Sequence, residues 1–394
     1  MRRRTFLIET SRAALSFSLL PLVAQAQANQ KHAESNEGAP SRTLVADLEK
    51  QIPTLMEEAM VPGLSIAVIK DGKLLWRRGF GVKDSGSNEP VDHDTMFEAA
   101  STSKPVFAYA VMKLCERGLM NLDTPLSKYT SARFLEGDPR LDQITARHVL
   151  SHTSGFQNWR SRDKPLSIHF THGEKWYYSG EGYSYLQSVV THLTGKVNPK
   201  DCGTFEAGLE VCATDIDAYM KANVLLPFGM ASSGYLWDDR MEKHMARGHD
   251  EKGKRFEKRR KPSGPSVARY GMAGELRTTP TDYARFLIEI IEPKPSDAFR
   301  LANASLQEMV RPQVKLPADM HIDGATSWAL GWAVQERSSG NVIVHSGGQA
   351  GFQALTMASV PRKCGFIILT NSNNGWKVFD HPEFEKAMNE LLDG

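Results

Sequence analysis

The sequence predicts an α/β (α+β) fold, in which an antiparallel sheet built from both ends of the chain is flanked by helices and joined to a mostly helical lobe. Runs rich in β-branched and apolar residues lie early, at 64–81, and late, from 328 to 370. Between them, residues 100–250 follow a mostly helical pattern with long loops. Strands at both chain ends are expected to share one sheet, and sites commonly form in the cleft between such lobes.

The strands can be placed one by one. Two early strands are expected at 64–70 and 73–81, separated by Asp71-Gly72. This dipeptide is a strong hairpin signal, because both residues tolerate the left-handed backbone of a tight turn. The late strands, joined by short turns at 339–341 and 361–363, are expected at 328–335, 342–345, 352–360 and 365–370.

Helix signals complete the outline. The segment 279–282, Thr-Pro-Thr-Asp, supplies an N-cap and an N-terminal proline for a helix that follows, and a final helix is expected at about 382–392. The mature chain, 42–394, is therefore predicted to consist of two lobes. The α/β lobe takes about 42–98 and 268–394, and the helical lobe about 99–267.

Composition narrows the classes of function. The chain has 394 residues, 41% of them hydrophobic, and a formal net charge of +2. A chain of this length can bury the core of one large domain or of two lobes. The near-balanced charge indicates no nucleic-acid partner. Beyond the N-terminal apolar stretch, no segment is long and apolar enough to be expected to cross a membrane.

Residues 1–28 are typical of a signal peptide of the twin-arginine type. Arg3-Arg4 precedes an apolar stretch at about 13–24, and small residues suited to signal peptidase follow up to Ala28. An uncleaved N-terminal anchor is the alternative, although the stretch is too short to span a bilayer. Residues 29–41 are polar and predict a flexible leader. A periplasmic or secreted bacterial protein is expected.

The pair Ser101 and Lys104 gives the strongest indication of chemistry. Residues three apart share one face of a helix, so the lysine amine is expected near the serine hydroxyl, where it can take the hydroxyl proton. Pro105 would clash with a helix that continues from upstream, so the helix is expected to begin at about Ser101, where unpaired N–H groups favour an oxyanion. A second Ser-x-x-Lys, Ser161 to Lys164, lies in a charged, aperiodic segment typical of a loop.

Two further segments could complete a catalytic site. Tyr178 is expected on a loop before a helix at 183–193. A phenol held between cationic groups has a lowered pKa and can move protons. His345 ends a predicted strand and is followed by Gly347 and Gly348. Glycines there let a substrate backbone lie close to the strand edge, and strand N–H groups can bind an oxyanion.

Taken in order, these segments resemble the serine β-lactamase and penicillin-binding-protein superfamily, in particular its class C β-lactamase, D-alanyl-D-alanine carboxypeptidase and esterase branch. The resemblance spans roughly residues 45–390 and implies a β-lactamase/DD-peptidase-like fold. The matching motifs are 97–105 for the nucleophile, 148–155 for Leu-x-His-Thr-Ser-Gly, 178–180 for Tyr-x-Asn, 273–282 for Ala-Gly-Gly-Leu with Thr-x-x-Asp, and 345–347 for His-x-Gly.

The resemblance implies a role for each matching residue. Ser101 would attack a carbonyl and become acylated, and Lys104 and Tyr178 would handle the proton; which of the two is the base differs between accounts of the superfamily. The backbone N–H groups of Ser101 and Gly348 would form the oxyanion hole. His345 would help to position the substrate and share in the proton network, and water would release the acyl group.

Three departures from the family pattern concern the substrate more than the reaction. Gly180 stands where many β-lactamases and peptidases carry asparagine, which contacts the acylamino group of the substrate. His345 stands where class C β-lactamases carry lysine, and Glu275 replaces the second glycine of Ala-Gly-Gly-Leu. Glu181 could partly replace the lost asparagine, although a solvated carboxylate is favoured.

The resemblance implies a serine hydrolase that acts on a small-molecule or peptide acyl substrate. The two changes at Gly180 and His345 favour an esterase or general acyl hydrolase first, a peptidase of D-amino-acid peptides second, and a β-lactamase third. A rival interpretation is a slow-turnover penicillin-binding protein that acts as a sink or sensor. If His345 is charged below about pH 6.5, it should favour acidic substrates.

No metal or cofactor is predicted. His148 and His152 are four apart on an expected helix, and His169 and His172 are three apart. A zinc peptidase would need glutamate at position 149, which is valine, and the family motif accounts for His152 without a metal.

The remaining charged and sulfur-containing residues have plain interpretations. Cys115 and Cys364 are expected to be buried free thiols, whereas Cys202 and Cys212 flank a short loop and either form a disulfide in an oxidising compartment or stay reduced. The basic run 252–261 is interpreted as a solvated loop in preference to the edge of an anion site.

Overall fold

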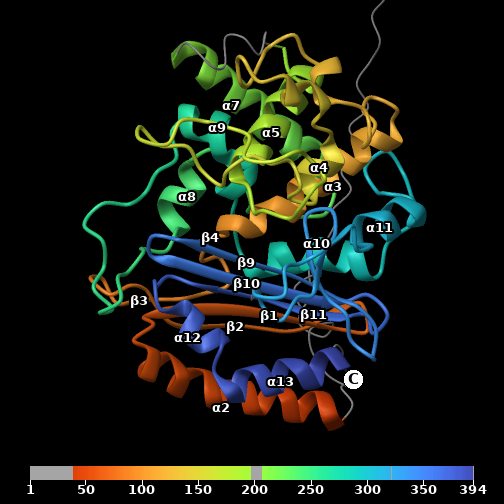
Figure 1. Cartoon of the computed structure of the whole chain (residues 1–394). Helices are drawn as coiled ribbons and strands as arrows, with labels where there is room; N and C mark the ends of the chain where they lie inside the picture. The colour runs from red at the N-terminus through yellow and green to blue at the C-terminus, as the bar shows by residue number, and fades with distance from the viewer. Residues whose placement is uncertain (1–38, 197–205, 321, 394) are drawn as a thin grey trace, which may run out of the picture. The chain divides into compact units, whose positions relative to one another are not determined.

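The computed structural model describes residues 39–196, 206–320 and 322–393 (Figure 1). The predicted signal peptide and all but the last three residues of the predicted leader lie outside the described residues. The chain divides into residues 1–46 and 47–394, and the architecture below is that of the second part. Helix α2 (Ala39–Ala59) crosses this division.

The described residues contain one large mixed-length sheet assembled from both ends of the chain. Strand β1 (Gly63–Lys70) pairs antiparallel with β11 (Cys364–Thr370), with Leu64 opposite Thr370. This pairing confirms the predicted antiparallel sheet. In order across the sheet the strands are β3 (Glu89–Pro90), β2 (Lys73–Asp84), β1, β11, β10 (Phe352–Ser359), β9 (Val342–Gln349), β8 (Ala333–Gln335), β7 (Ser327–Trp328) and β6 (Val314–Lys315).

The first hairpin forms where its turn residues predict it. Asp71 and Gly72 both have positive φ, of 52° and 70°. This conformation matches the right-handed twist of the flanking strands, and glycine and aspartate tolerate it well. Strands β1 and β2 consequently pair over most of their length, from Gly63 opposite Gly81 to Lys70 opposite Lys73.

One strand prediction is wrong. The run 328–335 is divided into β7 and β8 by a turn. Gly331 takes a φ of 86° in that turn, and a Cβ at this position would come within 2.7 Å of the Cβ of Ala108. The Gly331 N–H donates to the carbonyl of Leu150. Contact with the helical part of the chain, and not the local pattern, therefore breaks the strand.

Helices cover both faces of the sheet (Figure 1). Helix α10 (Pro280–Ile291) packs on β1 and β11, and Thr279 caps it as predicted, accepting from the Asp282 N–H at 3.2 Å. Helices α12 (Gly375–Phe379) and α13 (Pro382–Asp393) pack on the opposite face, against β10 and β11.

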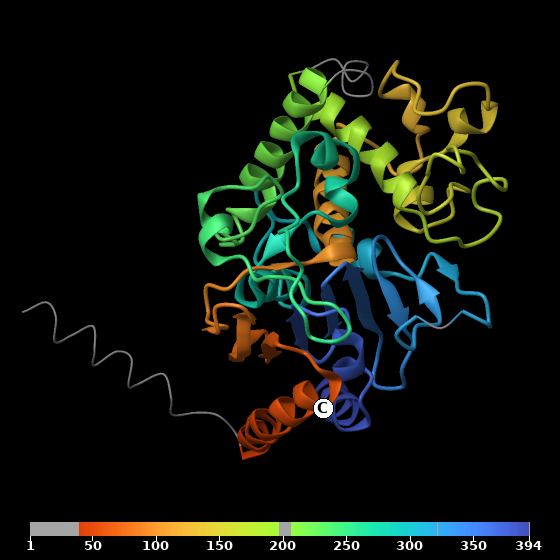
Figure 2. The ribbon, with the colours of Figure 1, turned by 90° about the vertical axis from the view of Figure 1, so that its left-hand side faces the viewer.

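The helices on the α10 side of the sheet position the candidate site. The long buried helix α3 (Ser103–Glu116) packs against α9 (Gly264–Gly274), which in turn packs against α5 (Gly180–Thr194) and α7 (Glu206–Met220). Figure 2 shows these helices gathered beyond one face of the sheet. Shorter helices are α4 (Ala146–Leu150), α8 (Asp239–His244) and α11 (Asn303–Val310). None of the helices described is both long enough and apolar enough to cross a bilayer.

The cysteines divide into two kinds. Cys364 is buried and free, as expected, whereas Cys115 is free but only partly buried. Cys212 is disulfide-bonded. Cys202 lies outside the described residues, so the predicted pairing of Cys202 with Cys212 stays a prediction.

Candidate active site

Ser101 lies in a strained turn at the entrance to α3. The α-helix itself begins at Ser103, two residues later than expected, and a 3₁₀ turn, η1 (Ala100–Thr102), precedes it. Ala100 has a φ of 47°, a left-handed conformation that is costly for a residue with a Cβ. Nearby hydrogen bonds hold the turn: the Ser103 hydroxyl donates to the Ala100 carbonyl at 2.6 Å and accepts from the Leu276 N–H at 3.1 Å. Thus the backbone around Ser101 is fixed before any substrate binds.

The Lys104 amine contacts the Ser101 hydroxyl directly. Its Nζ lies 3.1 Å from Ser101 Oγ and 2.7 Å from the carbonyl oxygen of Ala273. The side chain is completely buried, and burial lowers the pKa of the Lys104 amine to about 7. Near neutral pH a large fraction of this amine is therefore uncharged and able to accept the serine proton.

Tyr178 contacts the same serine from the loop before α5. Its hydroxyl is hydrogen-bonded to Ser101, and the Lys104 Nζ lies 4.8 Å from the centre of its ring. Burial raises the pKa of the Tyr178 phenol above its ordinary value, and the bond to Ser101 opposes this only in part. The expectation of a lowered pKa is wrong, because desolvation outweighs the neighbouring amine. The phenol is protonated at neutral pH. The helix after it begins at Gly180, earlier than expected.

His345 is buried and neutral within β9, which continues to Gln349, so it does not end its strand as expected. Its Nδ1 lies 2.7 Å from the carbonyl oxygen of Ser346. A carbonyl only accepts, so Nδ1 carries the proton and Nε2 is left as an acceptor. Burial, and then the charge of Lys104, lower the pKa of His345 to about 3 despite the Ser346 bond. The hypothesis that His345 is charged below about pH 6.5 is therefore wrong.

Aromatic rings enclose these groups. The ring of His152 lies 4.2 Å from that of Tyr178, and Trp328 lies 5.9 Å from Tyr178 and 5.6 Å from His345. Trp176 and Tyr183 complete the cluster. The family motif indicated His152, but no motif indicated a role for Trp176 or Trp328. The density of aromatic residues at 176–178 was the available signal. The cluster excludes water from Lys104 and so produces its low pKa.

The position of His152 differs from the expected one. Helix α4 ends at Leu150, and His152 follows it with a φ of 56°, so His148 and His152 do not share a helix face. Its Nδ1 accepts from the Ser179 N–H at 3.1 Å, which ties it to the Tyr178 loop. Across the described ranges, no three histidine, cysteine, aspartate or glutamate side chains gather as metal ligands would.

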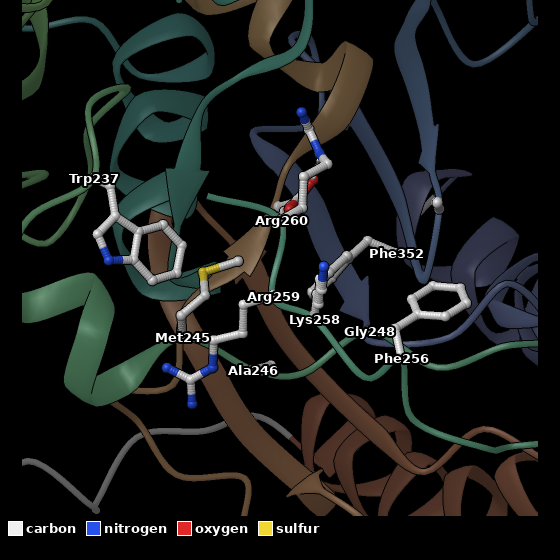
Figure 3. A pocket seen from close by; sticks show the side chains of 11 residues that line it. Trp237, Met245, Ala246, Gly248, Phe256, Lys258, Arg259, Arg260 and Phe352 are labelled. Atoms are coloured by element: carbon white, nitrogen blue, oxygen red, sulfur yellow. Dashed lines mark hydrogen bonds and ion pairs between the residues drawn. The ribbon is translucent and has the colours of Figure 1, made fainter. Parts of the chain in front are cut away.

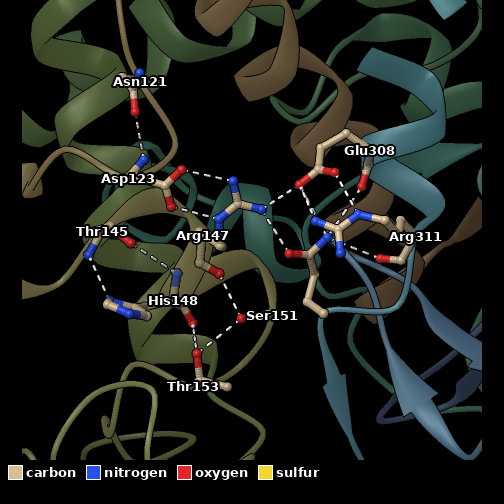
Figure 4. A network of polar contacts seen from close by, with 10 residues as sticks. Asn121, Asp123, Thr145, Arg147, His148, Ser151, Thr153, Glu308 and Arg311 are labelled. Carbon is tan, nitrogen blue, oxygen red and sulfur yellow. Dashed lines mark hydrogen bonds and ion pairs between the residues drawn. The ribbon is translucent and has the colours of Figure 1, made fainter. Parts of the chain in front are cut away.

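An ion-pair network anchors the segment that carries His152 (Figure 4). Arg147 on α4 contacts Asp123 at 2.6 Å and Glu308 of α11 at 2.5 Å, and donates to Gln313 at 2.7 Å. Thr145 caps the helix by accepting from the His148 N–H. These contacts tie a five-residue helix, which is too short to be stable alone, to α11.

The two glycines of the third motif lie beside the nucleophile turn. A Cβ on Gly347 would come within 2.7 Å of the Ala99 carbonyl oxygen and 2.9 Å of the Ser101 nitrogen. Any side chain at Gly347 would therefore push β9 away from Ser101. Gly348 follows on the same strand and, with Ser101, lines a cavity of about 310 Å³.

Gly180, which stands in place of the family asparagine, lies against the side chain of Trp159. A Cβ on Gly180 would come within 2.3 Å of the indole of Trp159, so the tryptophan occupies the space of the missing side chain. Trp159 stands edge-to-face on Tyr270, with ring centres 5.3 Å apart, and both rings line the Ser101 cavity. Neither Trp159 nor Tyr270 was indicated by the sequence.

Glu181 is not the solvated carboxylate that was favoured. It is 1% exposed and binds Arg160 with Nη2 to Oε2 at 2.6 Å and Nε to Oε1 at 2.9 Å. The Arg160 backbone N–H donates to the same carboxylate at 2.8 Å. Arg160 also lines the Ser101 cavity. The pair thus fixes the loop of Trp159 and Arg160 at the start of α5.

Glu275 belongs to a group of four charges, of which Glu98, Glu275 and Arg277 are buried and Arg260 is partly exposed. It accepts from Arg260 at 2.8 Å and from the fully buried Arg277 at 2.7 Å. Arg260 also donates to Glu98 at 3.1 Å and to Gln349. The basic run is therefore not wholly a solvated loop, because Arg260 at its end is anchored beside the site. The second Ser-x-x-Lys lies in a largely exposed loop, as predicted.

Curated proteins are similar to this chain over most of its length. Protein flp of Staphylococcus aureus (strain MRSA252) is 23% identical over 367 residues, which cover 86% of this chain and 66% of that protein. The chain thus spans just under two thirds of the length of that relative. Penicillin-binding protein 4* of Bacillus subtilis (strain 168) is 23% identical over 377 residues, covering 86% of this chain and 73% of that one.

Solved structures show the same fold. The octameric penicillin-binding protein homologue from Pyrococcus abyssi matches with a TM-score of 0.68 and 25% identity, covering 88% of this chain and 76% of that one. The D-alanine carboxypeptidase AmpC from Burkholderia cenocepacia matches with a TM-score of 0.69 at 18% identity, covering 89% and 99%. A class C beta-lactamase matches with 0.69 at 18%, covering 91% and 98%.

The family match covers nearly all of the chain that the structure describes. The beta-lactamase family matches residues 48–387, a range that contains Ser101, Lys104, Tyr178 and His345. Proteins of the beta-lactamase and penicillin-binding superfamily are serine hydrolases, and this chain belongs to the beta-lactamase family.

Proposed function

We propose that this protein is an exported hydrolase that forms an acyl-enzyme on Ser101 and prefers esters to β-lactams. The observation that carries the proposal is the desolvated Lys104 amine, 3.1 Å from Ser101 Oγ, with a pKa lowered to about 7. An amine at this pKa is matched to taking a serine proton near neutral pH.

The pKa of Lys104 is lowered and that of Tyr178 is raised, which supports different roles for the two residues in proton transfer. Lys104 takes the proton as Ser101 Oγ attacks the substrate carbonyl. Tyr178, with its pKa raised by burial, stays protonated and relays a proton to the leaving group. The reverse path then serves deacylation, in which water attacks the acyl carbonyl and the proton returns to Ser101.

The remaining motif residues assist this step. The N–H groups of Ser101 and Gly348 bind the developing oxyanion, and the absence of a side chain at Gly347 keeps the two backbones close. His345, neutral and with Nε2 available as an acceptor, positions the substrate without contributing charge.

The wall around Gly180 supports an ester substrate. The indole of Trp159 occupies the place of the family asparagine, so an acylamino group has no side-chain amide to contact there. Trp159 and Tyr270 instead offer aromatic surface to the acyl group. A hydrolase of apolar acyl esters fits this wall better than a β-lactamase does.

A peptidase is the second candidate. Arg160 lines the cavity and can face a substrate carboxylate, as the free end of a D-amino-acid peptide would provide. One structural relative is a D-alanine carboxypeptidase by its printed name. In this chain the buried Glu181 pairs with Arg160 and neutralises most of its charge, and for this reason the peptidase is the second candidate.

We further propose that the protein is exported and that its chain forms two lobes. The twin-arginine pattern and the small residues before Asn29 support export to the periplasm or medium. The α/β lobe at about 42–98 and 268–394 and the helical lobe at about 99–267 are proposed as two parts of one catalytic unit, with Ser101 where they meet.

A substrate panel on the purified protein tests the proposal. We expect Ser101→Ala to abolish turnover of a chromogenic ester, whereas Ser161→Ala, the matched serine of the second Ser-x-x-Lys, retains it. The same enzyme is assayed with a D-Ala-D-Ala peptide, a β-lactam and fluorescent penicillin. Full ester turnover by Ser101→Ala would overturn the proposal, and a stable penicillin adduct without ester turnover would favour the slow penicillin-binding protein.

A further inference from the structure

A second cavity lies apart from Ser101, against the loop that joins α8 to α9. It encloses about 290 Å³. Its apolar lining comes from Trp237, Met245, Phe256 and Phe352. Figure 3 shows Trp237 and Met245 at one end and Phe256 and Phe352 at the other. We name it the basic-rimmed pocket, because Lys258, Arg259 and Arg260 complete its lining.

A wall separates this pocket from the Ser101 cavity. Arg260 donates to Glu98, which lines the basic-rimmed pocket, and to Glu275 and Gln349, which line the Ser101 cavity. These bonds place the guanidinium between the two spaces. A molecule in the basic-rimmed pocket is therefore not an extension of one bound at Ser101.

The charges of the rim do not cancel. Arg260 and Arg277 are balanced by Glu98 and Glu275. Among the residues described, Arg259 and Lys261 share a single carboxylate, that of Glu242, at 3.8 Å and 2.5 Å.

Lys258 adds a cation to this excess. It is exposed and makes no hydrogen bond or ion pair with any of the residues described. The rim thus has positive charge left over for a ligand, and the lining beneath it is apolar.

We propose that the basic-rimmed pocket binds an apolar monocarboxylate, with its hydrocarbon body against Phe256 and Phe352 and its carboxylate toward Lys258. The pairing follows from the site: an apolar lining gains from burying hydrocarbon, and an unpaired ammonium at the rim gains from one negative charge. The size of the pocket suits a medium-length acid, of the kind that ester hydrolysis releases.

Calorimetry with octanoate tests this site. Ser101 is first blocked with a fluorophosphonate, whose attachment reports the proposed nucleophile independently. We expect octanoate to bind the blocked protein, butyrate to bind at least about tenfold more weakly, and octanol to bind more weakly than octanoate. Lys258→Glu should weaken octanoate about fivefold. Lys254→Glu, on the same exposed loop but outside the lining, should leave it unchanged, and both variants should retain ester turnover.

A filling substitution makes a second test. Ala350 is exposed and lines the pocket, so Ala350→Trp should abolish octanoate binding while the protein still unfolds cooperatively. Loss of octanoate binding on phosphonylation, with no effect of Lys258→Glu, would place the acid at Ser101 and overturn the proposal. Absence of octanoate binding to the unmodified protein would also overturn it.

Discussion

The surroundings of Lys104 and Tyr178, on one side of Ser101, are closed by aromatic rings, whereas on the other side the part of the Ser101 cavity lined by Trp159 and Arg160 is held by ion pairs. On the first side, rings from several segments exclude water, and this burial moves the pKa of each titratable group. On the second side, Glu181 pairs with Arg160 and Glu275 pairs with Arg277, so each charged side chain is held by an opposite charge.

The two sides also differ in how they relate to the family motifs. The residues expected to move protons keep motif spacing, and their environment is apolar. Two of the residues that depart from the motifs, Gly180 and Glu275, each meet a partner outside their own motif. Trp159 replaces the missing side chain at Gly180, and Arg260 with Arg277 receives the added carboxylate of Glu275. The local motifs thus determine where the residues proposed to move protons lie, and contacts with residues outside those motifs determine the shape of the substrate wall.

Lys104→Met should break the apolar side most severely. Without the amine, ester kcat/KM should fall about 10³-fold, because general-base catalysis of this kind contributes about 10²–10⁴-fold. The variant should also melt at a higher temperature at pH 7. Folding lowers the pKa of the Lys104 amine from about 10.4 to about 7. Between these two values the unfolded chain binds a proton that the folded protein does not, so the free energy of unfolding decreases as the pH falls from about 10.4 toward 7.

Lys164→Met, the lysine of the second Ser-x-x-Lys, is the matched control and should change neither ester turnover nor melting temperature. Stopped-flow ester assays and thermal melts of both variants check the expectation. Unchanged turnover in Lys104→Met would show that Lys104 is not the base.

Glu275→Gly tests the ion-paired side by restoring the family residue. It removes one of the two carboxylates that face the fully buried Arg277, and breaking a buried pair in this way costs about 3 kcal/mol of unfolding free energy. Urea denaturation measures the change. Glu257→Gly, an exposed glutamate of the nearby loop, should cost much less. Equal effects of the two substitutions would mean that the four-charge group stabilises nothing.

Features governed by neighbours in sequence could be predicted from it. Asp71-Gly72 forms its hairpin and Thr279 caps its helix, because each acts within a few residues. The break between β7 and β8 could not be predicted, since Gly331 turns where it meets Ala108. The same holds for Glu181: a charged residue beside a glycine is expected to be exposed, but Glu181 lies in the first turn of helix α5 and its partner Arg160 lies on the loop before that helix.

The electrostatics of the site were the least predictable part. Proximity to a lysine suggested a lowered pKa for Tyr178, and a histidine in the third motif suggested a charge near neutrality. Both directions are wrong, because burial by His152 and Trp328, which come from separate segments, outweighs the pairwise charges. The sequence indicates the groups that are proposed to carry the chemistry, and the packing of rings from distant segments sets their protonation.

The pH profile of ester kcat/KM sharpens this point. The amine must be uncharged to accept the serine proton, so activity should rise about tenfold from pH 6 to pH 8 through the Lys104 pKa of about 7. His345, with a pKa of about 3, should add no inflection between pH 5 and pH 8. Steady-state assays of the wild type and of His345→Asn check this. An inflection near pH 6.5 that disappears in His345→Asn would mean that the histidine is charged after all.

The smallest expected effect concerns the substrate wall. Gly180→Asn alone should slow ester turnover a few-fold, because its Cβ would meet the Trp159 indole at 2.3 Å; the ring is 42% exposed and can move aside. Trp159→Ala with Gly180→Asn frees the space and supplies an amide for an acylamino group. Penicillin acylation should then rise about fivefold, the gain from one net hydrogen bond. Trp159→Ala with Gly180→Ala opens the same space without the amide and should show no such gain in the fluorescent-penicillin assay. Equal gains in both double variants would assign the effect to space alone, and the wall would then select by size and not by hydrogen bonding.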